Sequence, residues 1–359
     1  MIAFVALLVS TLIIAPASAQ LIGVCYGMQA ANLPSPAEVV NLYRSNNIYR
    51  MRLYGPDQAV LQALANSGIR LLMDVPMTEL QSLATSSSAA MDWVLSNVAA
   101  HWPSVTFRYI AVGNEAVPGD LAQHVLPAMR NVHSALVTAG LASHVKVSTS
   151  VGAEVLESSF PPSAGAFSTD ASTFLSPIAA FLANTSSPLL VNAYPYFVYA
   201  DNYAQVSLSY ALMNETGTVV QDGEFAYTNL FDAMIDSVHA ALKREGVQQL
   251  AVVVSESGWP TAGGYGASVL NAQTYIKNLI RHVGRGTPTS PGKLEAYING
   301  MFDENLKSPE VERNFGLFKP NMEPIYPLNF VGDRPEFDGQ SESIFSGNIR
   351  LIVSLHVPS

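Results

Sequence analysis

The sequence predicts a single (β/α)8 barrel, an α/β TIM-barrel fold, with a small subdomain after its sixth strand. Three observations favour this fold. Short apolar runs recur eight times between residues 22 and 302, helical periodicity separates them, and most runs are continuously apolar, as in parallel strands buried on both faces. A chain of 359 residues is long enough for two domains, but barrels of this class commonly exceed about 250 residues as one domain.

The eight expected strands lie between turn or cap signals. In chain order they are Ile22–Tyr26, Ile48–Tyr54, Ile69–Val75, Phe107–Gly113, Val145–Val151, Leu189–Tyr194, Leu250–Ser255 and Leu294–Phe302. Eight alternations of strand and helix are typical of a closed barrel.

Apolar residues at helical spacing mark the helices between these strands. One stripe spans residues 121–136 and another spans 230–242, with Thr228 expected to cap the start of the second and Gly246 its end. An open doubly wound sheet is the alternative, but it calls for a glycine-rich phosphate turn after an early strand. The segment Gly263-Gly264-Tyr265-Gly266 has the wrong spacing for that turn and is interpreted as a flexible loop.

After the sixth strand the chain runs from Pro195 to about Tyr227 before the next helical pattern. This is too long for an ordinary connection, and it carries Tyr199, Tyr203, Tyr210 and Phe225. We therefore expect a small subdomain that lines one wall of an open groove, suited to a polymer gripped in mid-chain.

Composition excludes several classes of protein. With 18 basic and 28 acidic residues the net charge is −10, which argues against nucleic acid or an anionic membrane as partner. Cys25 is the one cysteine, so no intrachain disulfide or cysteine-based metal cluster can form, and the seven histidines lack metal-ligand spacing. We expect a monomer that needs neither metal nor cofactor.

Both chain ends are expected to lie outside the folded body, which we assign to residues 20–330. Residues 1–19 combine an apolar run with the small-x-small pattern Ala17-Ser18-Ala19 and are predicted to be a signal peptide, the alternative being a buried first helix. Sequons at Asn184 and Asn214 fit the secretory route. Residues 331–359 lack core periodicity and are expected to be disordered or loosely docked and dispensable for activity.

Two of the expected strands end in a glutamate, Glu115 in FRYIAVGNE and Glu256 in LAVVVSES. A carboxylate that closes an apolar strand is costly to desolvate unless it is hydrogen-bonded or serves a purpose. The carboxyl ends of barrel strands carry the chemistry, and the fourth and seventh strands lie on roughly opposite walls. Two facing carboxylates are what glycoside hydrolysis needs. The alternative is that each glutamate caps a helix or pairs with an arginine.

Five motifs narrow this interpretation. They are MRLY (Met51–Tyr54), AVGNE (Ala111–Glu115), NAYPYF (Asn192–Phe197), VVSESGWP (Val253–Pro260), and FDENLK through ERNFGLF (Phe302–Phe318). From Ile22 to Phe330 the chain resembles the plant family 17 glycoside hydrolases, which comprise endo-1,3-β-glucanases and 1,3-1,4-β-glucanases. The resemblance implies a retaining endo-hydrolase with Glu115 as general acid/base and Glu256 as nucleophile.

Aromatic residues at or just beyond the strand ends can supply flat platforms for glucose rings, and tyrosine adds a polar handle. These residues are Tyr54, Tyr194, Tyr196, Phe197 and Trp259. Each can equally be core packing, but the family motifs place Tyr54 and Tyr194 on the cleft.

The resemblance also implies polar contacts to the sugar. Asn114, next to Glu115, would direct its amide at the 2-hydroxyl, the alternative being a strand-end turn residue, and Asn192 in the NAYPYF motif would bind substrate. Glu304, Lys307 and Glu312 fall where the family has a charged cluster, in which an ammonium between carboxylates can hold a proton-shared network in one state. The alternative for Glu304 and Lys307 is an exposed i,i+3 helix pair.

The motifs alone do not distinguish 1,3-β-glucan from mixed-linkage 1,3-1,4-β-glucan as substrate. The resemblance favours 1,3-β-glucan as substrate over mixed-linkage 1,3-1,4-β-glucan on family breadth. A glucan-binding protein without catalysis is the alternative of another class, and loss of a catalytic glutamate would indicate it. Some family members carry a short removable extension that directs them to the vacuole, so we expect secretion to the cell wall or vacuolar delivery through residues 331–359.

Overall fold

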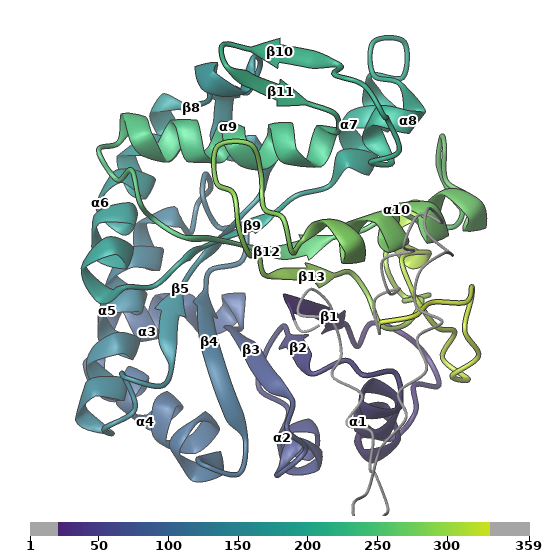
Figure 1. Cartoon of the computed structure of the whole chain (residues 1–359). Helices are drawn as coiled ribbons and strands as arrows, with labels where there is room; N and C mark the ends of the chain where they lie inside the picture. The colour runs from purple at the N-terminus through teal and green to yellow at the C-terminus, as the bar shows by residue number, and fades with distance from the viewer. Residues whose placement is uncertain (1–20, 331–359) are drawn as a thin grey trace, which may run out of the picture.

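The computed structural model describes residues 21–330 (Figure 1). The predicted signal peptide, 1–19, and the predicted extension, 331–359, lie outside the described residues. Between Leu21 and Phe330, no helix combines the length and the apolar character that crossing a membrane requires.

One parallel sheet forms the centre of the fold. Its neighbouring strands, in order, are β5 (Lys146–Ser148), β4 (Thr106–Val112), β3 (Arg70–Val75), β2 (Arg50–Leu53), β1 (Ile22–Tyr26), β13 (Ala296–Ile298), β12 (Val252–Ser257), β9 (Leu189–Asn192) and β6 (Ser150–Val151). The two edges of this order, β5 and β6, are parts of one run of chain. The sheet therefore closes on itself into a barrel of eight staves, which confirms the predicted fold.

Thr149 is the residue that separates β5 from β6. Its hydroxyl donates to the carbonyl of Gly113, 3.0 Å away, and its own carbonyl accepts from the backbone N–H of Leu190 at 3.1 Å. One residue thus joins the strands on either side, so the fifth stave changes pairing partner without opening the barrel.

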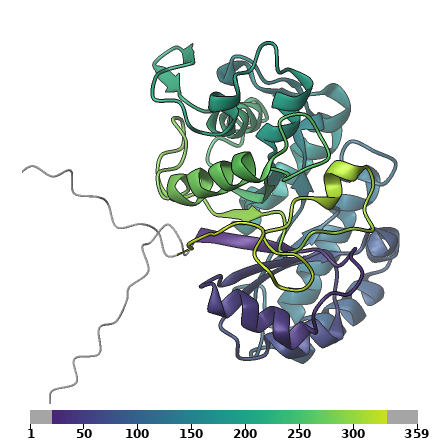
Figure 2. The ribbon, with the colours of Figure 1, turned by 90° about the vertical axis from the view of Figure 1, so that its right-hand side faces the viewer.

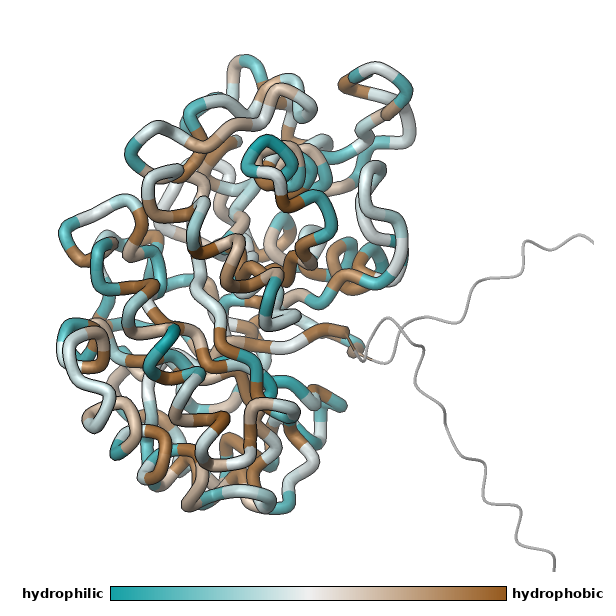
Figure 3. Tube along the Cα trace, turned by 90° about the vertical axis from the view of Figure 1, so that its left-hand side faces the viewer, coloured by the Kyte–Doolittle hydropathy of each residue, from teal (hydrophilic) through white to brown (hydrophobic). Residues whose placement is uncertain are grey.

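Helices surround the barrel (Figure 1). Apart from the helices that follow β9 directly, they are α1 (Pro36–Ser45), α2 (Gln58–Leu64), α3 (Leu80–Thr85), α4 (Ser87–Asn97), α5 (Ala122–Thr138), α6 (Thr169–Thr185), α9 (Leu230–Arg244) and α10 (Val269–His282). Apolar and polar stretches alternate along the chain, and polar stretches occur at many of the outer turns (Figure 3).

The predicted start of α9 is wrong by one residue, and its predicted end at Gly246 is confirmed. The N-cap is Asn229 rather than Thr228, because the Asn229 side chain accepts from the backbone N–H of Asp232 at 2.8 Å and its amide donates to the carboxylate of that residue. Gly246 follows the helix with a φ of 82°, the left-handed conformation that ends many helices. Asparagine is among the strongest N-cap residues, so it starts the helix one residue later than predicted.

The last strand differs from the prediction. Strand β13 has three residues, and no α-helix follows it among residues 299–330, where a 3-10 turn, Glu310–Arg313, is the one helical element. Prolines and glycines interrupt this segment repeatedly, so a regular helix cannot propagate. The segment instead lies beside β1 (Figure 2), and Met301 donates its backbone N–H to the carbonyl of Cys25 at 2.8 Å.

The predicted subdomain is present. After β9 the chain forms α7 (Pro195–Asp201), α8 (Leu208–Ala211) and an antiparallel hairpin of β10 (Val220–Asp222) and β11 (Phe225–Tyr227). Figure 1 shows this hairpin above α9. The smaller hairpin of β7 (Leu156–Ser158) and β8 (Ala166–Phe167) follows the fifth stave.

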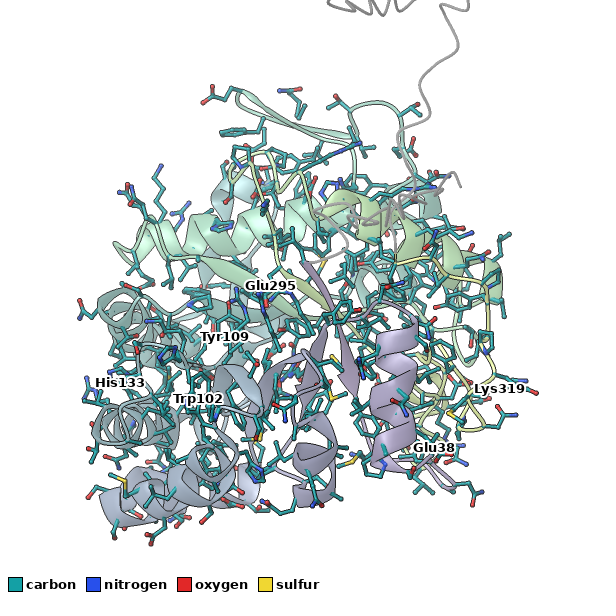
Figure 4. The ribbon with its side chains drawn as sticks, turned by 60° about the horizontal axis from the view of Figure 1, so that its bottom comes forward. Glu38, Trp102, Tyr109, His133, Glu295 and Lys319 are labelled. Carbon is teal, nitrogen blue, oxygen red and sulfur yellow. The ribbon has the colours of Figure 1, made fainter. Side chains whose placement is uncertain are left out.

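The barrel interior holds a small apolar cluster and, at the amino-terminal ends of the strands, a group of ion pairs around Glu295. The cluster consists of Cys25, Leu72, Tyr109, Ala111, Leu190, Val253 and Tyr297. At the amino-terminal ends of the strands, Glu295 pairs with Arg50 at 2.8 Å and with Arg108 at 2.6 Å. Figure 4 labels Tyr109 and Glu295 near the middle of the barrel at this end. These ion pairs lie at the amino-terminal end of the barrel, and the predicted site residues lie at the carboxyl-terminal end.

Candidate active site

A cleft of about 810 Å³ opens at the carboxyl ends of the strands. All the predicted site residues except Trp259 line it: Tyr54, Asn114, Glu115, Asn192, Tyr194, Glu256, Glu304, Lys307 and Glu312. Segments that are far apart in the chain therefore bring their polar groups to one place.

Glu256 lies near the end of β12 and is 8% exposed. Its Oε1 accepts from Nη1 of Arg52 and from the hydroxyl of Tyr54, both at 2.8 Å, and its Oε2 accepts from the hydroxyl of Tyr194 at 2.6 Å. An ionised carboxylate is an acceptor alone, so three converging donors match its oxygens and fix its orientation. An oriented carboxylate is what a nucleophile requires.

Arg52, which sequence reasoning missed, is the cation at the base of the cleft. It lies in β2, is 0% exposed, and donates from Nε and Nη2 to the carboxylate of Asp74 at 3.2 and 2.7 Å. Its Nη1 reaches Glu256, and its Nη2 reaches Oδ1 of Asn114 at 2.9 Å. A lone basic residue inside the apolar run Met51–Leu53 was the available signal, because a buried charge must be paired.

Glu115 reaches the cleft through a sharp turn after β4. Gly113 has a φ of 83° and Glu115 a φ of 52°, and the backbone N–H of Glu115 donates to the carbonyl of Ser150 at 2.8 Å. Both residues adopt the left-handed conformation, which is costly for a residue with a Cβ and is often found at functional sites. The turn leaves Glu115 exposed at the wall of the cleft.

Although the residue is exposed, the cleft around its carboxyl group desolvates that group in part, which raises the pKa of Glu115 above the ordinary value. A hydrogen bond from Asn192 opposes this rise, and the negative charges of Glu256 and Glu154 add to it. A raised pKa keeps the carboxyl protonated closer to neutral pH, which a general acid requires.

Asn192 connects the two glutamates. Its Nδ2 donates to Oε1 of Glu115 at 2.8 Å, and its Oδ1 accepts from Ser255 Oγ at 2.7 Å and from Nη1 of Arg52 at 3.2 Å. Since the same arginine holds Glu256, both carboxylates are positioned through one network. The Oδ1 atom of Asn114 also accepts from this network, so Nδ2 is its amide atom left to donate to a ligand.

The charged cluster of the last segment also lies in the cleft. Lys307 Nζ pairs with Oε2 of Glu304 at 2.7 Å, and the backbone N–H of Gln29 donates to Oε1 of Glu304 at 2.9 Å. Glu304 is 4% exposed, so the alternative of an exposed helix pair is wrong. Burial would lower the pKa of Lys307, but the neighbouring carboxylates, Glu304 foremost, outweigh it and raise that pKa. Burial raises the pKa of Glu312, with the charge of Lys307 opposing.

Trp259 lies behind the cleft rather than on it. The indole is 1% exposed, donates from Nε1 to the carbonyl of Gly266 at 3.0 Å, and packs edge-on against Tyr196 with ring centroids 5.2 Å apart. The chain has already left β12 at this position, so the ring turns away from the barrel axis. Among the aromatic residues considered, Tyr54, Tyr194 and Phe197 line the cleft, and Tyr196 and Trp259 support them.

Asn299, just after β13, is a further cleft residue that sequence reasoning missed. Its Nδ2 donates to the hydroxyl of Tyr194 at 2.9 Å, so the proton of that hydroxyl points at Glu256. The assignment is unambiguous because the hydroxyl has one proton and an ionised carboxylate has none. No sequence pattern marked Asn299.

In the described part of the chain, no group of three or more histidine, cysteine, aspartate or glutamate side chains is placed to hold a metal ion. The reacting groups that the cleft offers are a fixed carboxylate and a carboxyl with a raised pKa. On a (β/α)8 barrel this pair defines a glycoside hydrolase.

Comparison with known families identifies which family of glycoside hydrolases the chain belongs to. Over residues 22–330 the chain matches the glycosyl hydrolases family 17 and belongs to that family. The resemblance inferred from the motifs is therefore confirmed.

Relatives show about 50% identity. A glucan endo-1,3-β-glucosidase of Nicotiana tabacum, the basic vacuolar isoform GLB, is 51% identical over 318 residues, which cover 88% of this chain and 86% of the relative. Lichenase-2 of Hordeum vulgare is 50% identical over 315 residues, which cover 88% of this chain and all of the relative. A solved plant β-glucan endohydrolase structure has a TM-score of 0.83 and 50% identity, over 86% of this chain and 99% of its own.

Proposed function

We propose that this protein hydrolyses internal 1,3-β-D-glucosidic linkages of β-glucans with retention of anomeric configuration. Glu256 attacks the anomeric carbon while Glu115 gives its proton to the leaving glycosidic oxygen. Glu115 then takes a proton from water, which displaces Glu256 from the glycosyl intermediate. The glycosidic oxygen leaves with the proton of Glu115, and water supplies the oxygen of the new anomeric hydroxyl and returns a proton to Glu115.

The observation that carries the proposal is the difference between the two carboxyl groups. Glu256 accepts from Arg52, Tyr54 and Tyr194, which stabilise its charge, whereas burial and neighbouring negative charge raise the pKa of Glu115. A carboxylate held by three donors suits the nucleophile, and a carboxyl group with a raised pKa suits the acid.

Tyr54, Asn114, Asn192 and Tyr194 are proposed to contact the sugar bound between the two carboxyl groups. Each lines the cleft and is held by the network that holds Glu256 or Glu115. The other charged residues, Glu304, Lys307 and Glu312, line the same cleft and are proposed to hold the bound chain.

The substrate class follows from the relatives. The tobacco relative is named for 1,3-β-glucan, which favours this linkage, and the barley lichenase of similar identity makes mixed-linkage 1,3-1,4-β-glucan the second candidate. A glucan-binding protein without catalysis is disfavoured, because both glutamates are present and in one network.

We infer that the protein acts as a monomer and follows the secretory route. A relative named as a vacuolar isoform supports the vacuole as one destination, with the cell wall as the other.

Release of reducing sugar from laminarin and from barley mixed-linkage glucan tests the linkage, and we expect faster release from laminarin. Proton NMR of the first minutes of hydrolysis tests the mechanism. Two successive displacements invert the anomeric centre twice, so the β-anomer should appear first. An initial α-anomer signal would contradict the retaining assignment.

A further inference from the structure

Two tyrosine rings are exposed together on the surface outside the cleft. Tyr203, just beyond α7, and Tyr265, in the loop after β12, are 58% and 55% exposed. Their ring centroids are 4.5 Å apart with an angle of 37° between the planes. We call these two residues the tyrosine pair. A protein gains by burying rings of this size, so two of them exposed side by side call for an explanation.

The loop that carries Tyr265 is clamped to the fold, unlike the flexible loop predicted from its glycines. The carbonyl of Gly266 accepts from Trp259 Nε1 at 3.0 Å and from Nδ2 of Asn271 at 2.8 Å. The backbone at Gly266 lies so close to Tyr199 that a Cβ there would come within 2.5 Å of the ring. Glycine is required for this approach, and these contacts fix the backbone next to Tyr265.

The tyrosine pair is continuous with the cleft wall through a series of ring contacts, some tilted and some edge-on. Tyr265 contacts Tyr199 with centroids 5.8 Å apart, and Tyr199 contacts Trp259 at 5.7 Å. From Trp259 the contacts pass to Tyr196 at 5.2 Å and then to Phe197, a cleft residue, also at 5.2 Å. The same rigid aromatic array therefore presents one surface to the cleft and another to solvent.

We propose that the tyrosine pair is a second binding site for a β-glucan chain, separate from the catalytic cleft. Flat, fixed rings stack on the CH faces of glucose, and a rigid platform loses little conformational entropy on binding. The exposed side chains of Asn202 and Gln205 beside Tyr203 supply hydrogen bonds to hydroxyls. This site rests on the proposed function, because its ligand is the polymer that the cleft cuts in mid-chain.

The test separates binding to polymer from cleavage of short chains. Binding to insoluble 1,3-β-glucan is measured by co-sedimentation in the Glu256→Gln background, with and without Tyr203→Ala and Tyr265→Ala together. Hydrolysis of a short soluble 1,3-β-linked oligosaccharide is measured in the active background. The matched control is Tyr49→Ala, since Tyr49 is 45% exposed and precedes β2 at the other end of the barrel.

We expect the double variant to lose about tenfold in affinity for the insoluble glucan, as for two stacking rings. Its hydrolysis of the short oligosaccharide should stay within about twofold of the parent, since neither residue lines the cleft. The pair Tyr203→Phe and Tyr265→Phe keeps the rings and should keep the binding. If the double alanine variant melts early, the single variant Tyr203→Ala provides the same comparison, because its ring contacts Tyr265 on the surface.

Unchanged sedimentation of the double variant overturns the second site. An equal loss in Tyr49→Ala also overturns it, because the loss would then be general to exposed rings. A parallel fall in oligosaccharide hydrolysis would place the tyrosine pair in support of the cleft instead. Failure of the parent enzyme to cleave the short oligosaccharide would contradict the proposed function rather than this site.

Discussion

Replacing Arg52 with leucine tests whether one buried cation holds the catalytic network together. Arg52 is 0% exposed and forms ion pairs with Asp74 at 2.7 Å and with Glu256 at 2.8 Å. In Arg52→Leu both carboxylates stay buried without their counter-charge. Removing one partner of a buried pair typically costs about 3–5 kcal/mol, which for a domain of this size lowers the melting temperature by roughly 6–15 °C.

The pH dependence of this loss gives a second, independent readout. Burial already raises the pKa of Asp74, and the charge of Arg52 opposes that rise, so the variant should raise the pKa further. When the pKa of a carboxyl group is higher in the folded than in the unfolded state, the folded protein loses stability as the pH rises from the unfolded-state pKa to the folded-state pKa. The deficit of Arg52→Leu should therefore be smaller at about pH 4 than at about pH 7.

Thermal unfolding followed by circular dichroism measures both effects. The triple variant Arg52→Leu, Asp74→Leu, Glu256→Gln removes all three charges and should recover most of the lost stability. The matched control is Lys319→Leu, which breaks an exposed pair with Glu323 at 3.7 Å and should cost about 0.5 kcal/mol or less. If Arg52→Leu melts within about 2 °C of the parent at pH 7, the reasoning about the buried charge is wrong.

Three further predictions concern the chemistry. Glu256→Gln should reduce turnover by several orders of magnitude while folding is retained, because no other group can form the glycosyl intermediate; a tenth of the parent activity would exclude the nucleophile assignment. Glu154→Gln removes a negative charge that raises the pKa of Glu115, so the alkaline limb of the pH–rate profile should move to lower pH, and a move to higher pH would contradict this. Asn299→Ala removes the donor to Tyr194, and kcat should fall about tenfold with KM nearly unchanged, as steady-state kinetics can show.

Sequence reasoning predicted the staves of the barrel well because each is buried on both faces and therefore reads as an apolar run. The first expected strand, Ile22–Tyr26, has the bounds of β1. The last, Leu294–Phe302, shortens to Ala296–Ile298, because the chain turns off the barrel at Asn299 to form the cleft. Hydropathy does not register such a turn, since Met301 and Phe302 are buried whether or not they belong to a strand.

The catalytic glutamates were predictable because an acid at the end of an apolar strand is chemically anomalous. Arg52 carried the same kind of anomaly but stood within a motif rather than at its end, and strand alternation alone does not say which face points into the barrel. Trp259 shows the opposite limit: closeness to a strand end places a residue near the cleft without fixing the direction of its ring. Asn299 lies where no pattern could have singled it out.

The pairing of β1 with β13 determines when the barrel can close during synthesis of the chain. Val24 lies opposite Ile298, so the barrel closes after nearly the whole folded body has been synthesised. Glu256 is synthesised 204 residues after Arg52, and Glu304 is synthesised 275 residues after Gln29. A growing chain therefore carries Arg52 and Asp74, which follows it by 22 residues, long before Glu256 exists, and contacts of such long sequence separation form slowly. Activity arrives only with the final segment, so a prematurely terminated chain that lacks it has no assembled catalytic centre.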